Sequence, residues 1–552
     1  MRHVPSTATL LLSTSLSTLA YANGTTLMPG GAASVSRAGA VAARPEDATA
    51  IVTNPAGLAF LPGAQVVVGV DAPFQKECVD PYGYYGWGVD KAGTTGFGNQ
   101  LDVGTKSQPG YAVTPLSPVC NSAGTFPLPQ IAAQGYIVKN LAYGIGFLEP
   151  VLVPGQQFGG SDGTVQTPYG PRPTPTRYTM VKQEVIFASA PSFSLAYRFV
   201  PQMAAGMTLQ ILSVAARSTQ AQNPFGGTAP STDFLSTVTA QDFFIPALTF
   251  SVHAKPTPAL NLMAAFKWSD DFRGSGDAAF ETNTYYRSYQ GVNVSGLANA
   301  PYANAPVRLS EIVLRLPWAL TAGARYAGLL KDNKSEGGDP MATERWDVEF
   351  DFDYSFDART STNSASLGQD VSVVTHTATG ATGTTTVSAN DLGTLNVNRH
   401  LLDSYALRLG GSYSVLPRKF AVNAGVFYES RGVDLAYADI DTFAFRRIGT
   451  SIGIMARFGW WDLRVGATHI ASETVEVAPS PQQSQVVGGS FDSLGNRVGG
   501  KVLADPAAPS PSQADAVAAK PQSSTGNRNA IINAGRYTAS FDVLSVGLTY
   551  HF

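Results

Sequence analysis

The chain has 552 residues, of which only 14% are charged and 10% are aromatic, and its formal net charge is −3. An ordinary globular protein has about 25% charged residues, so several separate soluble domains are excluded. The small negative charge offers no basic surface for nucleic acid. The sequence contains no stretch of 18 or more apolar residues, which excludes membrane-spanning helices.

The first 22 residues have the pattern of a secretory signal peptide. Two basic residues precede an apolar stretch at 10–20, which ends in the small-residue cleavage pattern Ala20-Tyr21-Ala22. The alternative is a buried strand, but serine and threonine interrupt the stretch without alternation. We therefore expect residues 1–22 to be removed and the mature chain to begin near Asn23.

The chain has only two cysteines, Cys78 and Cys120, which excludes a disulfide-rich scaffold and any multi-cysteine metal site. Export to an oxidising compartment favours a disulfide between them, with two free thiols as the alternative.

A period of two dominates the chain beyond residue 60. From Trp346 to Asp357 every even position is large and apolar, and every odd position is acidic or a serine. A strand places these two sets on opposite faces, whereas a helix would mix them. Water on one face and hydrocarbon on the other explains so aromatic an apolar face better than a soluble sandwich does.

Fourteen segments share this alternation. They lie near 64–72, 127–138, 141–151, 183–199, 204–216, 240–254, 259–280, 306–327, 344–358, 402–416, 419–430, 446–458, 461–472 and 538–552. Short connections alternate with long ones, and the long ones are 73–126, 152–182, 217–239, 281–305, 359–401, 431–445 and 473–537. Short turns at one end and long loops at the other are typical of a barrel in the bacterial outer membrane. We predict an all-β fold, a 14-stranded antiparallel transmembrane β-barrel over residues 64–552.

The C-terminus supports a barrel. Residues 544–552 alternate between apolar and small or polar residues and end at Phe552. This ending resembles the signal that the bacterial barrel assembly machinery reads, so we expect that machinery to be a partner. We expect a monomer embedded in outer-membrane lipid.

The same alternation turns five arginines toward the lumen: Arg315, Arg325, Arg408, Arg457 and Arg464. Facing lipid near the midplane, each would cost about 2–4 kcal/mol. For the first three we favour neutralisation of the carboxylates in 344–358. For Arg457 and Arg464, contact with an anionic ligand head group and neutralisation stay equally open.

Residues 36–59 resemble the plug of the FadL family of long-chain fatty acid transporters, which includes channels for aromatic hydrocarbons. The resemblance rests on Ser36-Arg37-Ala38-Gly39, on Glu46-Asp47-Ala48 and above all on Asn54-Pro55-Ala56. It implies that residues 23–63 form a plug (hatch) inside a fourteen-stranded barrel. Proline restricts Asn54 to extended conformations, and the asparagine side chain can bind backbone groups that no ladder satisfies. We interpret Asn54, Pro55 and Ala56 as gating residues.

The resemblance also implies an inward kink in the third strand, through which substrate leaves sideways. That strand contains Gly144 and Gly146, which can bend, and Pro150, which lacks a ladder donor. The alternative is that the glycines make room for the plug.

No motif indicates catalysis, a metal or a cofactor. The six histidines are scattered without metal-ligand spacing, and no Gly-x-Ser-x-Gly occurs. His253 is the only strand histidine in an outward phase, and it has no assignable serine partner. We therefore expect a channel for passive uptake of long-chain fatty acids or aromatic hydrocarbons. The alternatives are a barrel that anchors enzymatic or adhesive loops, and a general porin.

Overall fold

The structure is a computed structural model. It describes residues 30–82, 116–148, 155–160, 163–167, 170–222, 234–282, 307–330, 339–367, 371–376, 382–387, 394–477 and 533–552. The expected signal peptide (1–22) and Pro150 lie outside these residues.

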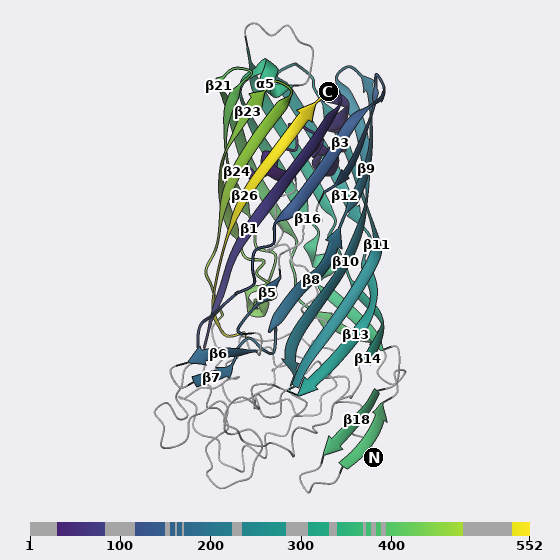
Figure 1. Ribbon diagram of the computed structural model, residues 1–552, viewed down its shortest axis with the longest axis vertical. Helices are drawn as coiled ribbons and strands as arrows, with labels where there is room; N and C mark the ends of the chain where they lie inside the picture. The colour runs from purple at the N-terminus through teal and green to yellow at the C-terminus, as the bar shows by residue number, and fades with distance from the viewer. Residues whose placement is uncertain are drawn as a thin grey trace.

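The wall is a closed antiparallel barrel of fourteen strands, as predicted (Figure 1). Around the barrel they are β1 (Gln65–Pro81), β3 (Leu128–Val138), β4 (Leu141–Phe147), β9 (Pro191–Val200), β10 (Met203–Gln222), β11 (Phe234–Ala254), β12 (Leu260–Ser269), β15 (Ala319–Leu329), β16 (Glu344–Ser355), β21 (Ser404–Leu416), β22 (Phe420–Glu429), β23 (Arg447–Phe458), β24 (Trp461–Ser472) and β26 (Gly535–His551). The first and last strands close the wall over their whole length, from Gln65↔His551 to Pro81↔Gly535. We call the end with the short connections and the C-terminus the turn end, and the opposite one the loop end.

Toward the loop end several strands resume after a short break. These pieces are β5 (Gln156–Gln157), β8 (Lys182–Ser189), β13 (Phe272–Thr282), β14 (Val307–Leu314), β17 (Thr362–Leu367), β20 (Thr394–Asn398) and β25 (Val475–Val477). The remaining strands are β2 (Val119–Cys120) and two separate hairpins, β6 (Thr164–Thr167) with β7 (Gly170–Pro173) and β18 (Val371–His376) with β19 (Thr382–Val387). Helical turns are short: α2 (Gly31–Val35), α3 (Ala50–Thr53), η3 (Pro55–Phe60), α5 (Pro340–Thr343), η5 (Asp357–Thr360) and η6 (Leu435–Tyr437).

The wall extends farther toward the loop end than the sequence analysis expected. Residues 73–81, 217–222, 234–239 and 281–282 were assigned to loops but belong to strands, and 359–401 and 473–537 also contain strand residues. The cause is a change in the outward side chains, which there include Lys76, Asp80 and Arg217. Once both faces are polar, apolar alternation no longer marks a strand.

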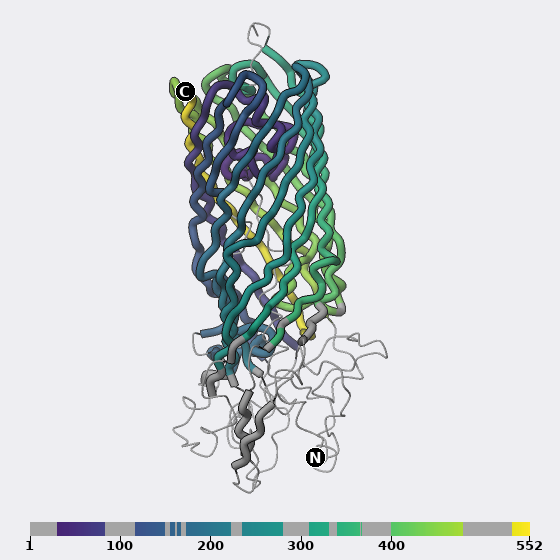
Figure 2. The backbone as a smooth tube through the Cα atoms, turned by 90° about the vertical axis from the view of Figure 1, so that its right-hand side faces the viewer, coloured from purple at the N-terminus to yellow at the C-terminus, as the bar shows by residue number. Residues whose placement is uncertain are grey.

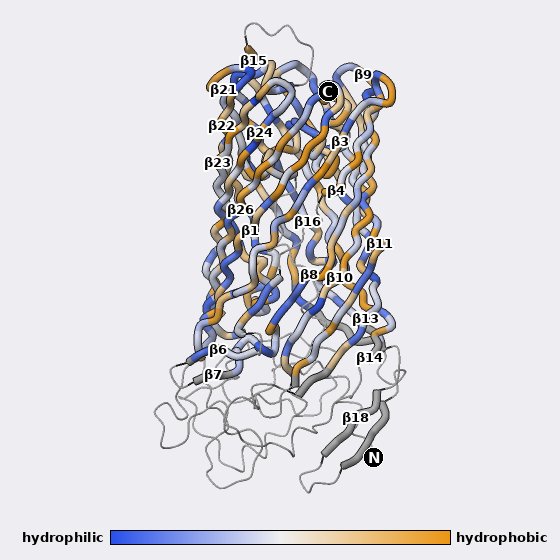
Figure 3. Tube along the Cα trace, viewed as in Figure 1, coloured by the Kyte–Doolittle hydropathy of each residue, from blue (hydrophilic) through white to orange (hydrophobic). Residues whose placement is uncertain are grey.

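Outward and inward side chains differ sharply in the middle of the wall. On β16, Trp346, Val348 and Phe350 are exposed, whereas Asp347 and Glu349 are buried. Hydrophobic and hydrophilic residues alternate along the wall strands in Figure 3. Apolar side chains outside a closed ladder are what a barrel in contact with lipid requires. Among the described residues, no helix is both long and apolar enough to cross a bilayer.

Residues 30–63, which we call the plug, lie inside the barrel near its turn end (Figure 2). Apolar plug side chains, among them Ile51, Leu58 and Phe60, form one buried cluster with Ala142, Ala196 and other small wall residues. Small wall residues therefore leave the space that the plug fills.

The expected loop 431–445 connects β22 to β23 and folds inward against the wall. Phe443 and Phe445 are fully buried and pack in one cluster with Phe427, Ile470 and Tyr537, which face inward from the wall. The segment is apolar enough to fold against the inner wall, a property that its position between two strands does not reveal.

Candidate functional site

Asn54 lies at the centre of a buried hydrogen-bond group between plug and wall. Its Nδ2 donates to the backbone oxygen of Ala42 at 2.7 Å and lies 2.8 Å from Nδ1 of His253. Its Oδ1 accepts from the backbone nitrogen of Gly57 at 3.1 Å and from Oγ of Ser251 at 3.2 Å. Asn54 is thus the N-cap of η3, and Pro55 suits the next position because an amide there would have no partner within the helix.

The wall beside η3 has small and hydroxyl side chains that let the plug backbone lie directly against the strands. A Cβ on Gly206 would lie 2.4 Å from the backbone nitrogen of Ala56, and that nitrogen donates to Oγ of Ser251 at 2.8 Å. Thr208 Oγ1 donates to the backbone oxygen of Ile51 at 2.6 Å. Three of these residues, Gly206, Thr208 and Ser251, were not predicted from the sequence, although their inward phase on the strands β10 and β11 was a usable signal.

His253 faces inward, so its expected outward orientation was wrong. Its side chain is fully buried, contacts Asn54, and lies with Nε2 3.3 Å from Oδ1 of Asn261. The expected phase was wrong because alternation runs unbroken from Ile245 to His253, which places His253 on the inner face with Thr249 and Ser251.

Gly144 and Gly146 do not interrupt the wall. Both are paired on each side, Gly144 with Gln134 and Ser194, and Gly146 with Ala132 and Ser192. A Cβ on Gly144 would lie 2.7 Å from the Ile51 side chain of the plug. This close approach supports the alternative for Gly144, namely that the glycine makes room for the plug.

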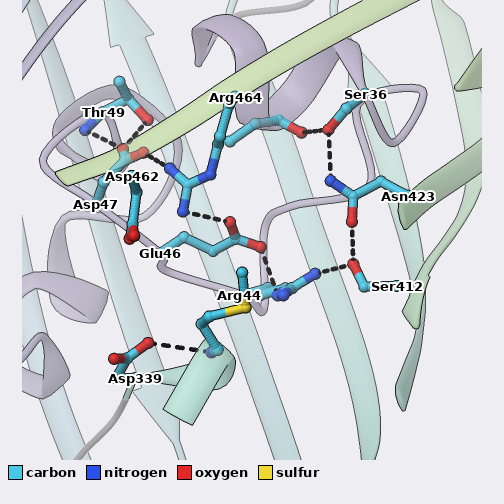
Figure 4. A network of polar contacts seen from close by, with 12 residues as sticks. Ser36, Arg44, Glu46, Asp47, Thr49, Asp339, Ser412, Asn423, Asp462 and Arg464 are labelled. Atoms are coloured by element: carbon cyan, nitrogen blue, oxygen red, sulfur yellow. Dashed lines mark hydrogen bonds and ion pairs between the residues drawn. The ribbon is translucent and has the colours of Figure 1, made fainter. Parts of the chain in front are cut away.

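The other side of the plug is tied to the wall by ion pairs (Figure 4). Arg44 contacts Glu46 within the plug at 2.5 Å and Asp347 of β16 at 3.0 Å. Arg464 of β24 pairs with Glu46 at 2.8 Å and with Asp47. All five side chains are buried, so each charge depends on its partner.

Further contacts reinforce this charged side. Arg37 pairs with Asp347 at 2.9 Å and with Glu349 at 3.2 Å, and the backbone nitrogen of Ala43 donates to Glu349 at 2.6 Å. Residues 36–47 are therefore held by charge, whereas residues 50–61 are held by apolar packing and by the Asn54 group.

The arginines expected in the lumen are mostly neutralised by protein carboxylates. Arg325 pairs with Glu344 and Asp347, and Arg408 pairs with Asp353 at 2.7 Å. The expectation that Arg315 faces the lumen and neutralises a carboxylate was wrong. Arg315 lies exposed in the break between β14 and β15 and makes no ion pair with a described residue.

Arg464 and Arg457, the two candidates for ligand contact, also have carboxylate partners. Arg464 binds the plug as described, and Arg457 pairs with Asp339 and Asp462 at 2.5 and 2.6 Å. The structure therefore gives both arginines partners within the chain.

Three inward cations differ from these arginines. They are Arg198 of β9, Lys255 directly after β11, and Lys267 of β12, and their side chains form neither an ion pair nor a hydrogen bond with any described residue. Lys267 is the next inward residue of β12 after Ala265, which packs against Ala43 of the plug. No group of three or more potential metal ligands occurs in the described part of the chain.

The ladder of the wall is interrupted between β1 and β8. Pairing of β1 with β3 ends at Asp71↔Leu128, and pairing of β4 with β9 ends at Phe147↔Pro191. Beyond these points, residues 72–76 of β1 and 184–189 of β8 have no described strand partner on the side that faces the interruption. In Figure 1 the two strands diverge here, with β5 between them.

A disulfide and the hydrogen bonds of a buried carboxylate stabilise the edge of this interruption that lies nearer the loop end. Cys78 and Cys120 are bonded, which fixes β2 beside β1. Glu77 Oε2 accepts from Asn121 Nδ2 at 3.0 Å and from Gln156 Nε2 at 2.8 Å. Large apolar side chains are exposed on the strands next to the interruption: Phe74, Phe147, Ile186 and Phe187.

No family model matches the sequence, and no curated protein matches it. Solved structures do match in fold. A Pseudomonas aeruginosa FadL homologue aligns over 96% of this chain and 100% of its own, with TM-score 0.63 and 15% identity. The Pseudomonas putida toluene transporter TodX aligns over 95% and 99%, with TM-score 0.52 and 12% identity. The Ralstonia pickettii toluene transporter TbuX aligns over 96% and 99%, with TM-score 0.51 and 12% identity.

At these identities the likeness establishes the fold, a transmembrane β-barrel of the bacterial outer-membrane type. The resemblance noted for residues 36–59 is thus confirmed at the level of fold.

Proposed function

We propose that this chain is an outer-membrane channel for passive uptake of hydrophobic molecules, either long-chain fatty acids or aromatic hydrocarbons. The observation that carries this proposal is the ladder interruption between β1 and β8. The plug obstructs the path along the barrel axis, so the interruption offers a way out through the wall. A closed ladder has no edge facing lipid, so an interruption bordered by exposed apolar side chains supports a lateral exit. The shared fold with a FadL homologue and two toluene transporters supports the substrate class.

In this mechanism the turn end faces the periplasm. Substrate leaves outer loop surfaces for the lumen, and a plug rearrangement around Asn54, Pro55 and Ala56 passes it to the interruption beyond Phe147. The charged contacts of residues 36–47 would keep the plug attached to the wall during this change. The chain supplies no energy source, so downstream consumption of the substrate drives net flux.

The test is uptake by cells that lack their own outer-membrane route for hydrophobic molecules and that express this chain. We expect faster uptake of oleate or toluene and no change for small sugars. If small hydrophilic solutes permeate and hydrophobic uptake is unchanged, the chain is a general porin. If neither changes, an anchor for enzymatic or adhesive loops is the better hypothesis.

A further inference from the structure

The inner face of β1 carries a carboxyl group at each end of the wall interruption. Alternation along the strand turns Asp71 and Glu77 inward, and both side chains are buried. Asp71 is the last residue of β1 that pairs with β3, and Glu77 directly precedes Cys78, where the pairing with β2 begins. We call residues 71–77 the exit segment, because they border the proposed lateral exit.

Both carboxyl groups are hydrogen-bonded to neutral donors. Gln130 Nε2 donates to Asp71 Oδ2 at 2.6 Å, and Ser545 Oγ donates to Oδ1 of the same residue. Glu77 Oε2 accepts from two side-chain amides, whereas its Oε1 has no hydrogen-bond partner among the described residues. Neither group forms an ion pair with a described residue. These donors stabilise the ionised form of each carboxyl group without cancelling its charge.

Carboxylates elsewhere on the inner wall are neutralised. Asp347 and Glu349 of β16 contact Arg37 of the plug, and Asp462 of β24 contacts an arginine of the neighbouring strand. The one cation of the exit segment, Lys76, is exposed and points outward. Negative charge without a cationic partner therefore lies directly beside the interruption.

This charge matters for any molecule that leaves the lumen sideways. Buried charges are screened by salt and water far less than exposed ones, so an anion beside the exit segment is strongly repelled. The inward side chains of the segment offer it no arginine or lysine as a partner. A hydrocarbon carries no charge and is not repelled, and the exposed apolar side chains that border the interruption suit it.

We propose that Asp71 and Glu77 determine the specificity of the lateral exit, which admits uncharged hydrophobic molecules such as aromatic hydrocarbons and excludes carboxylate anions. This inference rests on the proposed uptake function. It decides between the two substrate classes of that function in favour of the uncharged one.

The experiment compares uptake of oleate with uptake of oleyl alcohol, which has the same chain and no charge. Cells without their own outer-membrane route for hydrophobic molecules express the full-length chain at about pH 8, at which oleate is ionised. Initial rates are compared between variant and wild type, so that differences in downstream consumption of the two compounds cancel. Asp71→Asn/Glu77→Gln should raise oleate uptake about tenfold, which corresponds to about 1.4 kcal/mol of repulsion, without changing uptake of the alcohol.

The matched control is Asp80→Asn, which removes an exposed carboxylate from the outer face of the same strand and should change neither rate. The single variant Glu77→Gln keeps the test decisive if the double variant does not fold. Its amide oxygen can accept both bonds that Oε2 accepts, and its amide nitrogen takes the place of the unpartnered Oε1. The exit segment therefore keeps its hydrogen bonds while it loses a charge, and oleate uptake should again rise.

An unchanged ratio of oleate uptake to alcohol uptake in both variants overturns the specificity role of the two carboxylates and leaves the uptake function intact. If the wild-type chain raises uptake of neither compound, the proposed function fails, which is a different result.

Discussion

Asn54 of the plug and His253 of the wall face each other, with Nδ2 of the asparagine 2.8 Å from Nδ1 of the histidine. Both side chains are fully buried, and the same asparagine caps η3. One side chain therefore sets the local fold of the plug and fastens it to β11. Because a buried polar group that loses its partner carries a large penalty, plug and wall should separate together at this point rather than one bond at a time.

Asn54→Ala tests this arrangement. The variant leaves the Ala42 oxygen, the Gly57 nitrogen and His253 without this partner, which should destabilise the seated plug by about 1–3 kcal/mol. The barrel ladder does not include Asn54, so heat-modifiable migration on gels should be unchanged. We expect impaired uptake of hydrophobic molecules. Normal uptake in a correctly folded variant would remove the gating role of Asn54.

Arg464→Gln should loosen the charged side of the plug. It leaves Asp47 buried without its arginine and Glu46 with Arg44 alone, and breaking a buried ion pair costs about 3–5 kcal/mol. Hydrogen exchange of residues 40–50 should therefore accelerate.

The matched control for Arg464→Gln is Asp542→Asn, which removes an exposed pair with His469 on the outer wall. An exposed pair is worth about 0–1 kcal/mol, so this variant should leave exchange in the plug unchanged. Equal exchange in the two variants would mean that the ion pairs do not hold the plug.

The barrel could be predicted from the sequence because lipid contact imposes a strict physical pattern. Residues 346–357 alternate for as long as one face meets hydrocarbon, and the strand count follows from repeated segments of this kind. The same dependence explains why residues 73–81, which continue a strand beyond the lipid, were not predicted as strand. His253 is a different case, because plain alternation with the inward Thr249 and Ser251 already puts it on the inner face.

The site was less predictable for a different reason. Asn54 stands out because asparagine before proline has local consequences, whereas Gly206 and Ser251 matter only through contact with a segment about 150 to 200 residues away. The interruption of the wall is a property of which strands pair, and Gly144 and Gly146 in the neighbouring strand do not cause it.

The disulfide between Cys78 and Cys120 should hold the rim of the wall interruption. It closes a span of 42 residues, and cross-links of that size contribute about 2–4 kcal/mol. In Cys78→Ser/Cys120→Ser we expect faster hydrogen exchange at residues 119–121 and unchanged exchange in β10. Reduction of the wild type should reproduce this pattern. Protection of residues 119–121 in both samples would show that the hydrogen bonds of Glu77 suffice.

Gly144→Val should disturb the plug through contact alone. The new Cβ would lie 2.7 Å from the Ile51 side chain and 3.0 Å from that of Leu58, and overpacking of this kind costs about 1–3 kcal/mol. The backbone pairs of Gly144 with β3 and β9 remain available, so the barrel should fold and keep its heat-modifiable migration. Exchange of residues 50–61 should accelerate.

The control for Gly144→Val is Gly124→Val, because nothing lies within 4 Å of a Cβ at that glycine. Faster plug exchange in the first variant alone would establish that the missing side chain at Gly144 makes room for the plug in the folded barrel. If Gly144→Val leaves residues 50–61 as protected as in the wild type, the plug does not rest against β4, and the apolar half of its attachment has to be sought on β9 and β10 instead.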